Sequence, residues 1–223
     1  MSAAHAAAPA PTHRLIASKY PPIDAFGTVA TAADLQAVMD LEGWTNDRLV
    51  ADRIRRLPED EWVYGRPNAS IVMAAFLHVA PGGSRFNNAD LGAWYAGASV
   101  TTSIAEVGHH LRRELAARGL PEGRRTFREY TAELRGAHRD IRGQQARLPD
   151  VYDPVSYAAS QDFGEAIRAA GEAGILYDSV RHAGGTAIVA YRPRNIVGVI
   201  QARHFELRVR TATQRIDVGT LTR

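Results

Sequence analysis

Three apolar segments in the C-terminal half constrain the fold of this chain more than any other feature. Residues 175–177, 186–191 and 196–207 each have the pattern of a β-strand, and the middle segment, TAIVAY, is nearly all apolar. A strand with apolar residues on both faces is typical of a position inside a sheet, covered from both sides. Residues 186–191 are therefore predicted to form a central strand.

Further strands and several helices are predicted upstream of these segments. Alternation of apolar and charged residues indicates a half-buried strand over residues 125–134, and helical periodicity places Ile104, Val107, Leu111 and Leu115 on one face of a helix capped by Thr101 or Thr102. The pattern predicts an α+β fold with a mixed or antiparallel sheet. The other predicted strands are residues 13–17, 93–97 and 137–141, and the other helices are residues 34–40, 47–57 and 156–170.

Length and composition favour a single domain. The chain has 223 residues, 45% of them hydrophobic, which is enough for one sizeable core. Residues 1–12 are rich in Ala and Pro and are expected to be disordered. We expect a single domain over residues 13–223, with a helical insertion at about residues 27–80.

Composition also excludes several classes of function. The chain has no cysteine, so disulfides, thiolate metal sites and cysteine nucleophiles are ruled out. Neither a signal peptide nor a membrane span is predicted, since the longest apolar run, residues 71–80, is interrupted by His78. A cytoplasmic location is expected. The arginine clusters at residues 53–56 and 112–113 are diluted by acidic residues, which favours solvated helix faces over a nucleic-acid site.

Three positions are candidates for chemistry. Glu106 lies off the apolar stripe of its helix and can face a cleft, although a carboxylate that stabilises the helix N-terminus is an equal alternative. Arg85 follows a Gly-Gly-Ser turn, from which a guanidinium can reach a phosphate or a surface carboxylate. Ser179 opens a polar, glycine-rich link between two apolar strands, where it can line a site or cap a turn.

Taken together, these residues resemble the signature of the RES-domain toxin family. The resemblance rests on Arg85-Phe86-Asn87-Asn88, Gly92 to Ala96 and Thr102 to Glu106, in which Arg85, Tyr95 and Glu106 are spaced by 10 and 11 residues. The segments His13 to Ile16, Ser160-Gln161, Gly174 to Arg181 and Ala187 to Tyr191 are similar to further blocks of the family, in the same order.

The resemblance implies a fold, a substrate and roles for individual residues. The fold would be ADP-ribosyltransferase-like, a small split sheet with flanking helices, and the substrate would be NAD⁺, cleaved at its nicotinamide–ribose bond without a metal. Arg14 and Arg85 would bind the pyrophosphate or ribose hydroxyls, Tyr95 would pack on nicotinamide, and Glu106 would hold the ribose 2′-hydroxyl and stabilise the cationic transition state. Ser179 would orient the phosphate or ribose end of NAD⁺.

The stretch of about 70 residues between Arg14 and Arg85 is longer than compact RES domains need. It resembles a longer subgroup in which protein ADP-ribosylation is known, which favours a protein acceptor slightly over water or inorganic phosphate. The resemblance also implies a small Xre-like helix-turn-helix antitoxin as the partner, and a homodimer within the toxin–antitoxin complex.

Other classes of function remain open at this stage. Glu106, His109 and His110 have the helical spacing of metal ligands, but no H-E-x-x-H pattern is present. His182 beside Ser179 is compatible with a Ser/His hydrolase, although the chain lacks a G-x-S-x-G elbow. A non-enzymatic binding partner on a RES scaffold is a further alternative, and the presence of all the signature polar residues argues against it.

Overall fold

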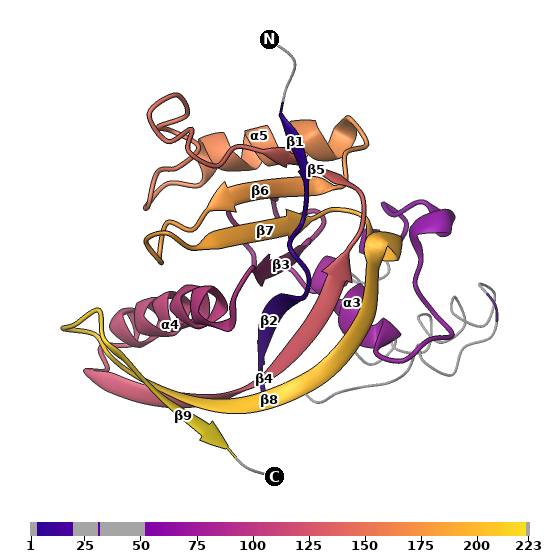
Figure 1. Cartoon of the computed structure of the whole chain (residues 1–223). Coiled ribbons are helices and arrows are strands. Elements are labelled where there is room, and N and C mark those ends of the chain that lie inside the picture. Colours follow the sequence, from indigo (N-terminus) through magenta and orange to yellow (C-terminus); the bar gives the residue numbers. More distant parts are fainter. Residues whose placement is uncertain (1–3, 20–30, 32–51, 222–223) are drawn as a thin grey trace.

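The computed structural model describes residues 4–19, 31 and 52–221, which form a curved mixed sheet with helices on both faces (Figure 1). Within the described residues the sheet has nine strands in the order β1-β5-β6-β7-β3-β2-β4-β8-β9, and all neighbours are antiparallel except β5 and β6. The predicted α+β class with a mixed sheet is confirmed. The strands are β1 (His5–Ala7), β2 (Thr12–Ala17), β3 (Trp94–Gly97), β4 (Glu122–Leu134), β5 (Ala137–Asp140), β6 (Gly174–Asp178), β7 (Thr186–Ala190), β8 (Ile196–Arg210) and β9 (Ile216–Leu221).

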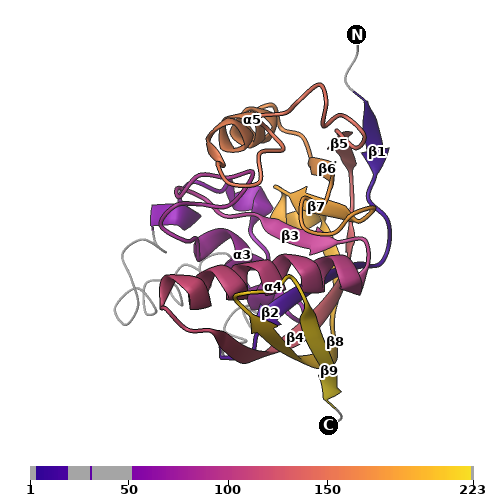
Figure 2. The ribbon, with the colours of Figure 1, turned by 90° about the vertical axis from the view of Figure 1, so that its left-hand side faces the viewer.

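The helices cover the sheet on two sides. Figures 1 and 2 show α4 lying inside the curve formed by β4 and β8, with α5 near β6 at the other end of the sheet. Strand β7 confirms the predicted central strand, because Ile188 and Ala190 pack in the core cluster with α3 while Ala187 and Val189 pack in the cluster that includes Ile167 of α5. The helices are α3 (Ala69–Leu77), α4 (Val100–Ala117) and α5 (Ala158–Ala169), with short 3-10 turns at Glu59–Glu61 and Pro193–Asn195.

The sheet is nearly divided between β2 and β3. These strands pair at one position only, His13 with Gly97, whereas β2 pairs with β4 from Thr12 to Ala17 along its whole length. The sheet therefore consists of two halves, which agrees with the expected split, joined at what we call the β2–β3 seam. Helix α4 starts beside this seam.

Helix α4 begins two to three residues earlier than predicted. Its N-cap is Ser99, in extended conformation, and the Ser99 side chain accepts a hydrogen bond from the Thr102 main-chain N–H. The expected caps, Thr101 and Thr102, lie in the first turn. The predicted apolar stripe packs as expected, with Leu111 and Leu115 buried against Val209 of β8.

The N-terminal residues differ from the expectation of disorder. From His5 to Ala7 they form β1, which pairs with β5, and the His5 ring lies 3.0 Å from the Glu172 carboxylate. Main-chain hydrogen bonds can hold an edge strand whatever its side chains are, so the Ala-rich composition did not predict that these residues are ordered.

The predicted helical insertion lies partly outside the described residues. The predicted helix 34–40 and the first part of the predicted helix 47–57 fall there, while residues 52–54 are helical. Helix α3 is almost wholly buried in the largest core cluster. Among the described helices, none has the length and apolar character needed to cross a membrane.

Candidate active site

A cleft of about 220 Å³ lies at the β2–β3 seam, and it brings together residues that are far apart in the sequence. Four of the predicted site residues line it: Arg14, Arg85, Tyr95 and Glu106. The fifth, Ser179, contacts Glu106 from behind this lining. Other lining residues are His13, Leu15, Ser84, Ala96, Gly97, Ser103, Val107, His110, Tyr157, Tyr177 and Ala187.

Glu106 is held by Ser179, the residue that follows β6. The Ser179 hydroxyl donates to Glu106 Oε1 at 2.7 Å and accepts from the main-chain N–H groups of Arg181 (3.2 Å) and His182 (3.0 Å). Glu106 is the seventh residue of α4, well past the first turn, so it does not serve as a carboxylate at the helix N-terminus. Among the described residues it is the one acidic side chain that lines the cleft.

Arg85 is buried, with 8% of its surface exposed. Its Nη1 donates to the carbonyls of Val151 (3.3 Å) and Asp153 (2.9 Å), and its guanidinium lies 4.7 Å from the ring centre of Tyr157. Its Nη2 is buried and has no hydrogen-bond partner within the described part of the chain. A buried N–H group without a partner is costly, so Arg85 Nη2 is a candidate donor to a ligand.

Arg14, on β2, links the two strands at the β2–β3 seam. Its Nη1 donates to the Tyr95 carbonyl at 3.0 Å, and its guanidinium lies 4.8 Å from the ring centre of Trp94. Its Nε is also buried and unpaired among the described residues. Burial lowers the pKa of Arg14 to about 10, so the group stays charged at neutral pH. Two arginines, one buried and one half-buried, each with a buried nitrogen that lacks a partner among the described residues, suit an anionic ligand.

Tyr95 is fixed by the segment that follows Arg85. Its hydroxyl donates to Asn87 Oδ1 at 2.8 Å and accepts from the Phe86 main-chain N–H at 2.9 Å. Burial raises the pKa of Tyr95 well above its ordinary value, so it remains neutral. Asn87 is fully buried and was not singled out in the sequence, although it lies inside the Arg85 motif.

The surroundings of the cleft are cationic. His110 lines the cleft, and burial together with the charges of Arg113 and Arg181 lowers its pKa. The same causes, with burial the largest, lower the pKa of His109 to about 4. Both imidazoles are therefore neutral at pH 7, and they add no charge to the arginines around them.

A second cavity of about 710 Å³ continues the cleft, because Ser84, His110 and Tyr157 line both. It is lined by Arg113 on α4 and by Gln161 on α5, whose amide donates to the carbonyls of Gly82 and Ser84. The two cavities are therefore adjacent, with Arg14 and Arg85 lining the first and Arg113 the second.

The two other chemistries considered in the sequence can be compared with the structure. No group of three His, Asp or Glu side chains that could hold a metal ion occurs in the described residues, and Glu106 accepts a hydrogen bond from Ser179. The His182 ring contacts Thr102 Oγ1 at 3.0 Å, and only its main-chain N–H reaches Ser179, so Ser179 and His182 form no nucleophile–base pair.

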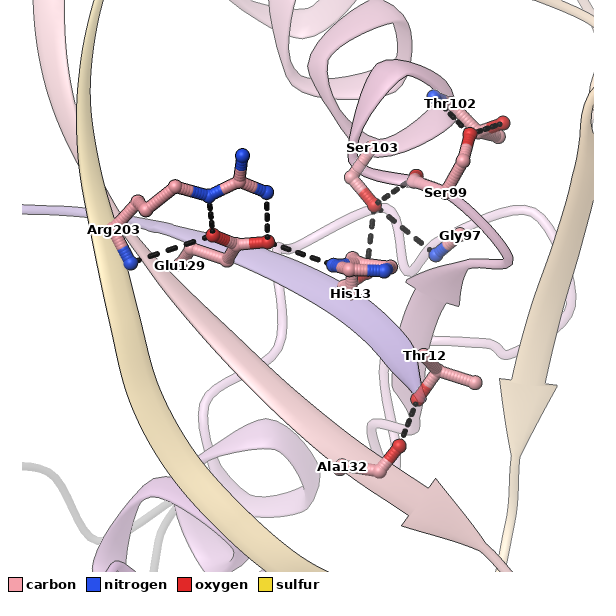
Figure 3. Close-up of polar contacts among 9 residues, drawn as sticks. All are labelled: Thr12, His13, Gly97, Ser99, Thr102, Ser103, Glu129, Ala132 and Arg203. Atoms are coloured by element: carbon pink, nitrogen blue, oxygen red, sulfur yellow. Dashed lines mark hydrogen bonds and ion pairs between the residues drawn. The ribbon is translucent and has the colours of Figure 1, made fainter. Parts of the chain in front are cut away.

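A buried polar network beside the cleft was missed by the sequence analysis. Glu129 is fully buried and is bonded to His13 and Arg203, while Ser103 is bonded to the His13 carbonyl (Figure 3). Glu129 lies in the predicted strand 125–134, but as one charged residue among several in the alternation. Glu129 differs from the other charged residues of this strand because it lies opposite Leu15, on the face covered by α4.

Comparison with known proteins places the chain in a family. No curated protein matches it. A solved structure, "Crystal structure of the M.tuberculosis MbcT-MbcA toxin-antitoxin complex", is similar at 22% identity over 55% of this chain and 73% of that one, with a TM-score of 0.41. The family model described as "RES domain" matches residues 50–210, which include Arg85, Tyr95, Glu106 and Ser179 but not Arg14. Since this match spans more than half of the chain, the protein belongs to the RES-domain family.

Proposed function

We propose that this protein is the toxin of a toxin–antitoxin pair and that it cleaves the nicotinamide–ribose bond of NAD⁺. The observation that carries the proposal is the composition of the cleft. One carboxylate, Glu106, lines a cavity together with Arg14 and Arg85, and each arginine has a buried nitrogen without a hydrogen-bond partner among the described residues. NAD⁺ presents the matching groups, a pyrophosphate for the arginines and a ribose hydroxyl for the carboxylate.

Each residue has a role in this proposal. The pyrophosphate or ribose hydroxyls would accept hydrogen bonds from Arg85 Nη2 and Arg14 Nε, both of which are buried and unpaired among the described residues. Tyr95 would pack on nicotinamide. Glu106 would bind the ribose 2′-hydroxyl, and Ser179, whose hydroxyl already donates to Glu106, would hold it in that position. The adenosine end would extend into the second cavity.

The chemistry needs positioning and charge more than a nucleophilic side chain. Nicotinamide is a cationic group in NAD⁺ and leaves as a neutral molecule, so the barrier lies in a ribosyl transition state with the character of an oxocarbenium ion. A fixed carboxylate stabilises that charge without reorganisation. Glu106 meets this need, because Ser179 and helix α4 fix its place.

The acceptor and the partner belong to the same proposal. We favour a protein side chain as the acceptor of ADP-ribose, on the ground of the expected 27–80 insertion, with water or inorganic phosphate as alternatives. By family resemblance the partner is an Xre-like helix-turn-helix antitoxin, the toxin is a homodimer within that complex, and the setting is the cytoplasm. A binding partner without activity on a RES scaffold is the second candidate.

A product assay by mass spectrometry tests the proposal. The purified protein is incubated with NAD⁺, with and without phosphate and cell lysate, alongside Glu106→Gln and, as a control, Glu133→Gln, an exposed carboxylate outside the cleft. Glu106→Gln keeps an acceptor for Ser179 but loses the charge, so turnover should fall about 10²- to 10³-fold. Free ADP-ribose means hydrolysis, ADP-ribose-1″-phosphate means phosphorolysis, and modified lysate proteins mean transfer. Intact NAD⁺ with the wild-type protein would reject the enzymatic proposal.

A further inference from the structure

His13 and Glu129 form a hydrogen-bonded pair at the edge of the cleft. His13 Nδ1 lies 2.7 Å from Glu129 Oε1, and Glu129 also accepts from Arg203 Nε at 2.8 Å and Nη2 at 3.1 Å. Figure 3 shows Glu129 lying between Arg203 and His13. The carboxylate is fully buried, whereas His13 lines the same cleft as Glu106 and keeps 17% of its side chain exposed.

The pair fixes the tautomer of His13. Burial alone would raise the pKa of Glu129, but the hydrogen bonds from Arg203 and His13 outweigh it and lower that pKa, so the carboxylate is ionised at neutral pH. An ionised carboxylate only accepts hydrogen bonds, so the hydrogen of a neutral His13 ring sits on Nδ1. Nε2 then carries a lone pair. Among the described residues it has no hydrogen-bond partner and is not a fully buried atom, and His13 is one of the residues that line the cleft.

The main chain of His13 is tied to the helix that carries Glu106. The Ser103 hydroxyl donates to the His13 carbonyl at 2.6 Å and accepts from the Gly97 N–H at 3.1 Å (Figure 3). Ser103 precedes Glu106 on α4 by about one helical turn. The strand that carries His13 is therefore tied to the helix that carries Glu106, and both side chains line the same cleft.

Building on the proposed cleavage of NAD⁺, we infer that His13 is the general base that takes the proton of the acceptor, and that Glu129 is its positioning residue. The ribose C1″–N bond breaks and its electron pair goes to nicotinamide. An acceptor oxygen, from water or a hydroxyl side chain, bonds to C1″ and gives its proton to His13 Nε2, from which it passes to solvent. Glu129 stabilises the imidazolium that forms.

The inference narrows the class of acceptor to groups that lose a proton on transfer. Water and the hydroxyls of Ser, Thr or Tyr belong to this class. An anionic nucleophile such as azide has no proton to lose and needs no base. Azide should therefore react in a variant that has lost only the base, but it should not react in a variant whose whole site is damaged.

The first test measures nicotinamide release by His13→Ala, with His204→Ala as the matched control. His204 is another partly buried strand histidine that contacts one side chain, Gln201, and it does not line the cleft. For His13→Ala, kcat should fall about 10²- to 10⁴-fold while KM stays nearly unchanged. Added azide should restore turnover of His13→Ala and give ADP-ribosyl azide, with no comparable gain for the wild-type protein or the control.

The second test shows whether Glu129 acts through His13. Glu129→Gln should lower kcat at least about tenfold, and the double variant should be no slower than His13→Ala alone. Thermal unfolding of each variant checks folding, and His13→Gln, which keeps a donor toward Glu129 but cannot take the proton, replaces His13→Ala if that variant fails to fold.

The outcomes separate this inference from the proposed function. If the wild-type protein leaves NAD⁺ intact, both are wrong. If the wild-type protein cleaves NAD⁺ and His13→Ala matches it, only the assignment of His13 is wrong. A slow His13→Ala variant that yields no azide product, or a double variant slower than both single variants by the product of their effects, would show a structural role and overturn the assignment.

Discussion

The cleft differs from the exposed end of the ribbon formed by β4, β8 and β9, which lies away from the buried Glu129, in how charged side chains are paired. In the ribbon, acidic residues face arginines in water, as in the pairs of Glu122 with Arg208 (2.7 Å) and Asp217 with Arg215 (2.7 Å). In the cleft, Arg85 is buried and Arg14 is half-buried, and each has a buried nitrogen without a partner among the described residues. Paired charges in solvent add little to stability, whereas a buried donor without a partner is costly, and under the proposed function its acceptor is NAD⁺.

Among the substitutions that test this comparison, we expect the largest effect at Arg85, on the affinity for NAD⁺. Arg85→Lys keeps the charge but loses the planar fork of donors, so the affinity for NAD⁺ should fall about 10- to 100-fold. Titration calorimetry in the Glu106→Gln background, where turnover is suppressed, measures it. Arg208→Lys in the ribbon is the control and should leave the affinity unchanged. An unchanged affinity for Arg85→Lys would mean that Arg85 only braces the carbonyls of Val151 and Asp153.

A smaller effect is expected at Ser179, on the far side of Glu106. Ser179→Ala leaves the N–H groups of Arg181 and His182 without their acceptor and Glu106 without its donor. The free energy of unfolding should fall by about 1–2 kcal/mol, and kcat should fall more than KM rises. Urea unfolding and steady-state kinetics measure the two effects. Full activity with Ser179→Ala would contradict the role given to this hydroxyl.

Glu114, on α4 between the two regions, should show a weak and pH-dependent effect. A hydrogen bond from Arg125 lowers the pKa of Glu114 to about 2. A depressed carboxyl pKa stabilises the fold above the unfolded value of about 4.3, and this stabilisation is lost as the pH falls towards 2.

The side chain of Glu114 is 36% exposed, so solvent screens the pair. Glu114→Gln should therefore cost only about 0.5–1 kcal/mol at pH 7. The difference from the wild-type protein should shrink between pH 4 and pH 3, as followed by urea unfolding. A constant difference across this range would assign the effect to packing.

The smallest effect is expected for Glu122→Gln in the ribbon. Its partners, Arg208 and Arg210, are both about half exposed, so water replaces the lost carboxylate at little cost. The midpoint of urea unfolding should stay the same at low and high salt. A clear loss of stability would show that charge in the ribbon is organised as a network, and the contrast with the cleft would weaken.

Sequence periodicity predicted most of the fold, because side-chain pattern dominates where faces are buried. Strands β2 to β8 and helices α4 and α5 were all predicted, with boundaries that shifted by a few residues. Strand β1 was missed because it is held by main-chain pairing with β5, and its Ala residues give no side-chain pattern that predicts a strand. Strand β9 was missed because its residues from Val218 to Leu221 are exposed, which leaves only its first residues to show a pattern of burial.

The candidate site was predicted only in part. The spacing of Arg85, Tyr95 and Glu106 pointed to three of its residues, all of which line the cleft. Spacing along the sequence could not show that Ser179 is hydrogen-bonded to Glu106, or that Glu129 is hydrogen-bonded to His13. Those contacts depend on the register of β2 with β4 and on the closeness of β6 to α4, which only the folded chain provides.

The position of β2 has a consequence for synthesis of the protein on the ribosome. This strand emerges early, ending at Ala17, yet both of its partners come later, β3 at Trp94 and β4 from Glu122. Ser179 follows later still, so Glu106 has no hydroxyl beside it until β6 has been made. A nascent chain therefore carries an incomplete cleft for most of its translation, and the point at which the proposed active site can be completed is set by the topology of the sheet.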